Sequence, residues 1–366
     1  MNKRKLNLAE SNASIIAALI GMFVGAIVLV VIIALYAIGH EGTDFKVLPA
    51  YMYLAFVITE GFMIAGVLLY TGFFKRVNLF RLFSFKKGFE IKRVVYLPFI
   101  AVGAVLLFAP IAELFVSFLM LFGYQPAAAD MSADGVAGFF ILLATGALLP
   151  AVIEEIVFRG ALMSGAKKRG AFFAVVYTSF IFMLFHGNPQ QTVHQFLLGL
   201  VLGWMAVTTG NISYGIILHF LNNLIAFSLV YAPIGEMHPI ARIAMYAAWM
   251  LVGALILIPS LKAFGKKSGE SADGAITNKG NFISRYAADV KGAVKRAYAF
   301  VSQKGTFKTM SAAFDLRYAE EQEPLITAPG EAIPEAPPKE KIFSAAAVIL
   351  ILGCAAMWLL SLFSGG

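Results

Sequence analysis

The stretch LPAVIEEIVFRG, residues 149–160, places two adjacent carboxylates and an arginine inside an otherwise apolar run. An ionisable side chain at membrane depth costs roughly 2.5–3.5 kcal/mol on insertion scales, so it persists where it pairs or takes part in chemistry. The composition of the whole chain also indicates a membrane protein, because 60% of the 366 residues are hydrophobic and only 14% are charged. Soluble domains carry roughly 25% charged residues. We therefore expect an all-α, polytopic transmembrane helical bundle.

Apolar runs that approach or exceed the length of a membrane span, about 20 residues, recur along the chain. They lie near residues 13–38, 50–73, 94–122, 136–164, 171–186, 192–208, 212–231, 240–264 and 342–363. This pattern predicts about 8–9 spans. The limits of the runs between residues 171 and 231 are the least well defined, because these runs are short and closely spaced.

Basic residues gather in every second connection, at residues 3–5, 75–93 and 167–169. The intervening connections are poor in lysine and arginine. The positive-inside rule then predicts a cytoplasmic N-terminus in a multi-pass protein of the plasma membrane, with the C-terminus outside after nine spans. The formal net charge of +8 follows from this topology, so we expect membrane lipid and no nucleic acid as a partner.

Helical spacing separates the charged residues of the opening stretch into an ion pair and one unpaired carboxylate. Glu155 and Arg159 are four residues apart, which predicts an ion pair on one helix face. Glu154 points about 100° away and has no local partner, which suits it to proton transfer. Pro150, four residues earlier, can open the helix and free a backbone carbonyl. We therefore interpret Glu154 as the reactive carboxylate and the pair as its support.

Two histidines on other apolar runs can converge on Glu154. His186 ends the fifth run, and a helical hairpin turning near Gly170 places it at a depth similar to that of Glu154. His219 and Asn223 share a helix face, where two N–H donors can stabilise an oxyanion. Counting along the helices puts His219 nearer the cytoplasmic side than Glu154, so tilt or an earlier helix start must close that gap.

Together, Glu154-Glu155-x-x-x-Arg159, Phe182-x-x-x-His186 and His219-x-x-x-Asn223 resemble the three motifs of the CPBP intramembrane proteases. That family includes type II CAAX prenyl endopeptidases and bacteriocin-processing and self-immunity proteins. The resemblance implies about eight transmembrane helices, an intramembrane cavity and hydrolysis of a peptide bond in a membrane-bound, lipidated or hydrophobic substrate. It implies that Glu154 and His186 activate a water, and that His219 and Asn223 hold the oxyanion.

We divide the chain accordingly. Residues 1–135 are expected to form N-terminal transmembrane helices, 136–232 the CPBP-like catalytic core, and 233–264 a further transmembrane helix. Residues 265–341 read as a cytoplasmic linker, first basic and then rich in proline and glutamate, and 342–366 as a C-terminal transmembrane helix. The basic part fits either an amphipathic helix on anionic lipid or a solvated linker.

Several alternatives stay open. Glu154, His186 and His219 supply the donors of a zinc site, while the family also allows a metal-free glutamate mechanism. His194 is a further possible ligand or cavity residue, although the start of an interfacial helix explains it as well. A proton-coupled transporter would use Glu60, Glu113, Glu154 and His186. A non-catalytic membrane scaffold would act through residues 265–341.

Overall fold

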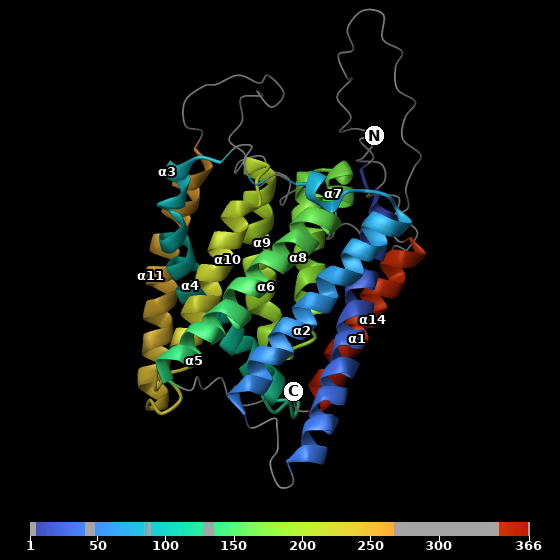
Figure 1. Ribbon diagram of the computed structural model, residues 1–366. Helices are drawn as coiled ribbons and strands as arrows, with labels where there is room; N and C mark the ends of the chain where they lie inside the picture. Colours follow the sequence, from blue (N-terminus) through green and yellow to red (C-terminus); the bar gives the residue numbers. More distant parts are fainter. Residues whose placement is uncertain are drawn as a thin grey trace, which may run out of the picture.

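The computed structural model describes residues 5–40, 48–83, 85, 89–126, 135–266 and 344–364, and within them it is helical without strands (Figure 1). The transmembrane helical bundle is thereby confirmed. The elements in chain order are α1 (Leu8–Gly39), α2 (Pro49–Leu68), η2 (Leu69–Phe74), η3 (Leu79–Arg81), α3 (Ile91–Val94), α4 (Leu97–Met120), α5 (Gly135–Leu142), η4 (Leu143–Leu148), α6 (Leu149–Glu154), η5 (Glu155–Leu162), α7 (Met163–Ala166), η6 (Lys167–Arg169), α8 (Ala171–Phe185), η7 (Pro189–Gln191), α9 (Thr192–Thr209), α10 (Ser213–Leu229), α11 (Pro239–Gly265) and α14 (Ala345–Ser364).

Seven helices within the described ranges are long and apolar enough to cross a membrane, and α8 and α10 are shorter apolar helices. The α4 span includes α3, and the fourth span runs continuously from Gly135 to Arg169. Successive apolar segments run in alternating directions, so the start of α1 and the end of α14 lie at opposite ends of the bundle (Figure 1). The predicted linker at 265–341 lies almost wholly outside the described residues.

Small residues let neighbouring helices approach closely. A Cβ atom at Gly21 on α1 would meet the carbonyl of Phe62 on α2, and one at Gly66 on α2 would meet that of Ala17. On the other side of the bundle, a Cβ at Gly103 on α4 would lie 2.8 Å from the backbone nitrogen of Leu257 on α11. Helices in lipid associate by such backbone contacts, because lipid tails are as apolar as the side chains.

The helix that carries the opening stretch is irregular on both sides of Glu154. Pro150 cannot donate a backbone hydrogen bond. The preceding residues Leu143–Leu148 and the following residues Glu155–Leu162 adopt π-helical turns. π-Helical turns inside α-helices are rare and frequently occur at functional sites. The segment from α5 to α7 crosses the bundle at an incline (Figure 1), so it gains less depth per residue than an upright helix.

The segment before α4 folds over the first turn of α10. Asn211 donates its Nδ2 hydrogen to the carbonyl of Phe85 at 2.8 Å, and the Tyr214 hydroxyl donates to the carbonyl of Glu90 at 3.2 Å. Tyr214 is fully buried. Helix α10 therefore begins beneath a covering segment and not at the surface of the bundle.

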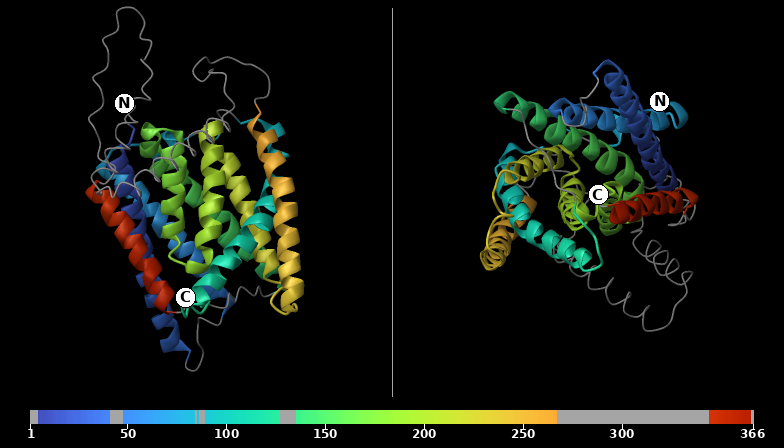
Figure 2. Two further views of the ribbon diagram at one scale, coloured as in Figure 1. Left: turned by 180° about the vertical axis from the view of Figure 1, so that it is seen from behind. Right: turned by 90° about the horizontal axis from the view of Figure 1, so that it is seen from below.

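The C-terminal helix α14 packs beside α1 and near the connection between α8 and α9 (Figure 2). Cys354 and Leu350 on its inner face are fully buried in the same apolar core as Phe158 and Phe182. The Trp358 indole donates to the Thr192 hydroxyl at 2.7 Å. This helix thus contacts the start of α9, although a long segment outside the described residues separates the two in sequence.

Candidate active site

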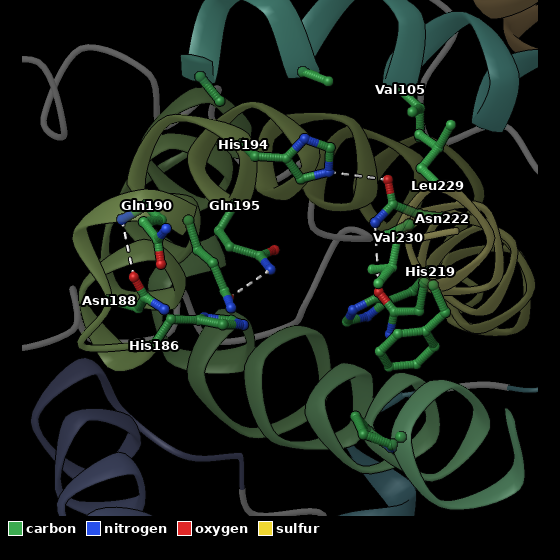
Figure 3. A pocket seen from close by; sticks show the side chains of 18 of the residues that line it. Val105, His186, Asn188, Gln190, His194, Gln195, His219, Asn222, Leu229 and Val230 are labelled. Atoms are coloured by element: carbon green, nitrogen blue, oxygen red, sulfur yellow. Dashed lines mark hydrogen bonds between the residues drawn. The ribbon is translucent and has the colours of Figure 1, made fainter. Parts of the chain in front are cut away.

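A cavity of about 870 Å³ lies inside the bundle. Helices α2, α4, α6, α9 and α10 contribute to its wall, as does the connection between α8 and α9. The ionisable residues of its lining are Glu60, Glu113, Glu154, His186, His194 and His219, and the amides are Asn188, Gln190, Gln191, Gln195, Asn222 and Asn223. Figure 3 shows His186 and His219 on different walls of this cavity. We call it the catalytic cavity below.

Three helices bring their ionisable groups to one carboxylate oxygen. The Nε2 atom of His186 lies 4.0 Å from Oε2 of Glu154, and Nε2 of His219 lies 3.8 Å from the same atom. Glu154 Oε2 has no hydrogen-bond partner among the described residues. The structure therefore assembles the three side chains that the motifs singled out, around an oxygen free to bind a small molecule.

The orientation of His186 follows from its own helix. Its Nδ1 lies 2.8 Å from the carbonyl of Phe182 one turn earlier. A carbonyl only accepts, so Nδ1 carries the hydrogen. In the neutral ring the lone pair is then on Nε2, which faces Glu154. The Phe182 ring also makes an edge contact with His186, with centroids 4.7 Å apart, so both residues of this motif set the imidazole position.

The predicted ion pair is present. Arg159 Nη1 lies 2.7 Å from Glu155 Oε1, and both side chains are fully buried. The second guanidinium nitrogen donates to the carbonyl of Gly199 on α9 at 3.2 Å. The central carbon of the guanidinium lies over the Phe182 ring, 4.6 Å from the ring centroid. Arg159 thus joins η5 to α9 and to α8, beyond the local pairing that the spacing indicated.

His219 lies between the two adjacent carboxylates. Its Nδ1 is 3.4 Å from Glu155 Oε1, on the side away from Glu154. His219 reaches Glu154 although residue counts put it nearer the cytoplasmic side. Helix α10 begins at Ser213, so an earlier helix start does not close that gap. The incline of the helix that carries Glu154 remains as the explanation (Figure 1).

Asn223 also reaches the cavity, one turn after His219. Its Nδ2 donates to the carbonyl of Ala147 in the irregular turn η4 at 3.4 Å. An amide has two N–H groups, so one remains for a ligand. The geometry places a His219 nitrogen and an Asn223 nitrogen on the same wall, which is the arrangement expected of an oxyanion site.

The sequence reasoning did not single out Asn222. It is 2% exposed, its Oδ1 accepts from His194 Nε2 at 3.1 Å, and its Nδ2 donates to Asn223 at 3.4 Å (Figure 3). His194 is therefore a cavity residue close to the start of α9. No local signal marks the pair, because Asn222 and His194 meet only through the packing of α9 against α10.

Glu60 and Glu113, the two further carboxylates of the transporter alternative, both line the catalytic cavity. Glu60 on α2 is 9% exposed, and its Oε2 has no partner among the residues described. Glu113 on α4 is exposed. Both carboxylates belong to the same cavity as Glu154.

The zinc alternative can be compared with these distances. Two ligand atoms of a tetrahedral zinc with bonds of 2.0–2.1 Å are about 3.3 Å apart. The spacings of 3.8 and 4.0 Å from Glu154 Oε2 to the histidine nitrogens are wider. Within the described ranges, no group of three or more His, Cys, Asp or Glu side chains is arranged to hold a metal ion. The side chains as placed do not fit zinc.

Comparison with known proteins gives one result. Residues 136–225 match the family described as Rce1-like, type II CAAX prenyl endopeptidase Rce1-like. The matched segment contains all three motifs. Searches of curated proteins and of solved structures found no match to the chain.

Proposed function

We propose that the protein is an intramembrane endopeptidase whose active site is the catalytic cavity. This proposal is supported by the match of residues 136–225 to the Rce1-like family of type II CAAX prenyl endopeptidases. Glu154 and His186 activate the attacking water. His219 and Asn223 stabilise the oxyanion, and Glu155 with Arg159 holds these groups in place. The substrate is a membrane-bound, lipidated or hydrophobic peptide, and the protein acts as a multi-pass component of the plasma membrane.

The observation that carries this proposal is the convergence on Glu154 Oε2. A water at 2.8 Å from both Glu154 Oε2 and His186 Nε2, which are 4.0 Å apart, subtends roughly 90° between its two hydrogen bonds. Both atoms are acceptors, so the water donates both hydrogens and turns a lone pair outward. This is the geometry that general-base catalysis requires.

The chemistry then proceeds with the residues present. The water oxygen attacks the scissile carbonyl carbon while Glu154 takes its proton. Negative charge develops on the carbonyl oxygen, toward which His219 Nε2–H and Asn223 Nδ2–H donate. As the carbon–nitrogen bond breaks, Glu154 returns the proton to the departing amine. The products are a new carboxylate and a free amine.

His219 is suited to its part by the charges on either side. Glu155 and Arg159 form a buried ion pair, and Glu154 adds a second carboxylate. His219 Nδ1 faces Glu155 Oε1 at 3.4 Å, and its Nε2 faces Glu154 Oε2 at 3.8 Å. Nε2 is therefore the ring nitrogen that is placed to donate toward the oxyanion.

We assign no metal to this reaction. The spacing around Glu154 fits a water at hydrogen-bond distances better than a zinc ion at ligand distances. Each step above uses only side chains of this chain and a water molecule. Retention of activity without bound zinc is accordingly expected.

The test is cleavage of lipidated and hydrophobic peptides by the purified protein in liposomes. Glu154→Gln and His186→Ala should each reduce the rate by about 10²–10⁴-fold, with folding unchanged. Glu236→Gln is the matched control, because Glu236 is exposed in the turn before α11. Full activity in Glu154→Gln would refute the mechanism.

Two other functions remain distinguishable by experiment. A proton-coupled transporter requires a path across the bundle, but apolar side chains, among them Leu97, Met205 and Leu218, are fully buried on one side of the cavity. Proton-driven uptake that depends on Glu60 and survives His219→Ala would favour transport. A scaffold acting through residues 265–341 would tolerate Glu154→Ala and lose function when that segment is deleted.

A further inference from the structure

Every helix that lines the catalytic cavity does so from the same end of the bundle. Helix α4 contributes from Val105 to Met120 and α10 from His219 to Val230, so both contribute mainly their later turns. Phe56 and Glu60 on α2 lie in the first half of the span Ala50–Phe74, and α9 contributes His194 and Gln195 from its first turn. Because these helices alternate in direction (Figure 1), all of these positions lie toward one end, the end of the α8–α9 connection.

The opposite end of the same helices is closed by apolar packing. Leu97 and Ile100 in the first turns of α4, Met205 late in α9, and Tyr214 and Leu218 early in α10 are all fully buried. At the same end, the carbonyl of Phe85 accepts a hydrogen bond from Asn211, in the turn before α10, and the carbonyl of Glu90 accepts one from Tyr214 in the first turn of that helix. The cavity therefore has one open end and one closed end.

The closed end carries the positive charge of the described chain. The helix ends and connections there hold Lys5, Lys75, Arg76, Arg81, Lys92, Arg93, Lys167, Lys168, Arg169, Lys262 and Lys266. Among the described residues at the open end, Arg242 is the one lysine or arginine. The positive-inside rule identifies the charged end as cytoplasmic. We call the two ends the basic face and the open face.

We propose that the catalytic cavity opens on the extracytoplasmic face of the membrane and receives its substrate from there. Helix α8 has 15 residues, about 22 Å, so it is shorter than the roughly 30 Å hydrocarbon core. The α8–α9 connection, with Asn188 and Gln190, is therefore recessed below the open face. A peptide segment displayed outside the cell, or dipping into the outer leaflet, reaches Glu154 without crossing the membrane.

The identity of the substrate that enters the cavity rests on the proposed function. The orientation of the cavity does not, so it can be tested without measuring catalysis. Cys354 is the single cysteine and is buried, so Cys354→Ala provides a cysteine-free background. Gln190→Cys in this background reports the open face, and Lys168→Cys, at an exposed position, reports the basic face. Intact cells are treated with a membrane-impermeant maleimide, with and without permeabilisation.

We expect labelling of Gln190→Cys in intact cells and of Lys168→Cys only after permeabilisation. The reverse pattern, or labelling of both from one side, would overturn the assigned orientation. Absence of labelling at Gln190→Cys even after permeabilisation would overturn the open end. The labelling result does not depend on activity. The orientation therefore stands even if the protein proves not to be a peptidase, and the peptidase function stands even if the orientation proves wrong.

A second inference concerns the charge of the ligand. The described residues that line the cavity include no lysine or arginine, and they include three carboxylates, Glu60, Glu113 and Glu154. Glu60 is nine-tenths buried, and its Oε2 has no partner in the described part of the chain. A buried carboxylate is costly unless it is paired. Phe56, one turn earlier on α2, lines the wall beside it and offers an aromatic face to a cation.

We infer that Glu60 binds a basic side chain of the substrate near the scissile bond. This also rests on the proposed function, so its test uses binding to the Glu154→Gln protein, which needs no turnover. Two fluorescent hydrophobic peptides that differ only in a lysine or a norleucine are compared. Glu60→Gln should weaken binding of the lysine peptide about tenfold or more and leave the norleucine peptide unchanged.

Glu236→Gln is the matched control and should change neither affinity. Equal weakening of both peptides by Glu60→Gln would assign Glu60 to packing and overturn the inference. A stronger affinity for norleucine than for lysine in the parent protein would overturn it as well. If the Glu154→Gln protein binds the lysine peptide as expected but the wild-type protein cleaves neither peptide, the peptidase function is refuted and the Glu60 site stands.

Discussion

Gly215 on α10 packs directly against the carboxylate of Glu155 on η5, since a Cβ atom at Gly215 would lie 2.7 Å from Glu155 Oε2. The other oxygen of Glu155 pairs with Arg159 at 2.7 Å, which limits how far the carboxylate can move. His219, one turn after Gly215, lies 3.4 Å from that same oxygen. The missing side chain at Gly215 thus sets the distance between α10 and the charged pair.

Gly215→Ala should therefore displace Glu155 and, with it, His219. A misplacement on the order of 1 Å near the reacting groups costs about 10²-fold in rate, so we expect kcat to fall by about 10–100-fold. Turnover of a lipidated peptide and the melting temperature should be measured together. Gly353→Ala on α14 is the control, because no atom lies within 4 Å of a Cβ there. An unchanged kcat in Gly215→Ala would contradict this account.

Arg159 should matter for stability as well as for activity. Arg159→Ala leaves the buried Glu155 without its partner, which costs about 3–5 kcal/mol. Arg159→Lys keeps the charge, but cannot pair with Glu155 and bond to the Gly199 carbonyl with one planar group, so its loss should be intermediate. Denaturant titration in mixed micelles measures the free energy of unfolding.

The control for this series is Arg242→Ala near the start of α11. Arg242 is only partly buried, and we expect a change within about 0.5 kcal/mol. Equal losses in Arg159→Ala and Arg159→Lys would show that the forked contacts of the guanidinium contribute nothing.

Asn223 should act in the transition state. Asn223→Ala removes an oxyanion donor, so kcat should fall by about 10²–10³-fold with little change in KM. Asn222→Ala should have a smaller effect, because the Asn222 oxygen serves His194 at 3.1 Å. Steady-state kinetics on one peptide measures both. A larger loss of kcat in Asn222→Ala than in Asn223→Ala would reverse the assignment of the two amides.

Metal removal should leave activity unchanged. The 4.0 Å between Glu154 Oε2 and His186 Nε2 fits a bridging water, so incubation with chelators followed by dialysis should not reduce the rate. Elemental analysis of the active protein should find zinc well below one ion per chain. Loss of activity that one equivalent of zinc restores would instead place a metal in the mechanism.

The C-terminal helix should position the recessed connection. Trp358→Phe removes the 2.7 Å bond to Thr192, worth about 0.5–1.5 kcal/mol, and should lower kcat by about 2–10-fold. Thr192→Val should have the same effect, and the double variant should be no worse than either single one. Leu360→Ala, on the exposed face of α14, is the control. Additive losses in the double variant would show that the two residues act separately.

Much of the architecture could be predicted from the sequence. The apolar runs marked the membrane-spanning helices, because a span needs length and hydrophobicity that are visible in any window. The ion pair of Glu155 with Arg159 followed from a separation of four residues on one helix. The irregular helix near Pro150 followed from its missing N–H. Each of these depends on contacts within one segment of chain.

The site was less accessible to such reasoning. The motifs named Glu154, His186, His219 and Asn223, but residue counting put His219 at the wrong depth. The bond between His194 and Asn222 gave no signal in the sequence. The contact of α14 with Thr192 was also unforeseen. These features join residues of different helices, and side-chain periodicity carries no information about where two helices cross.

The sequence by itself determined that this chain is a multi-spanning helical protein with two carboxylates and an arginine at its centre. Only the tertiary structure decided that His186 and His219 meet at Glu154, that Glu60 shares their cavity, and that this cavity is closed toward the basic face. The physical reason is that local hydrogen bonding and hydrophobicity specify each helix. Close contacts such as that of Gly215 with Glu155, together with helix tilt, specify how the helices are assembled.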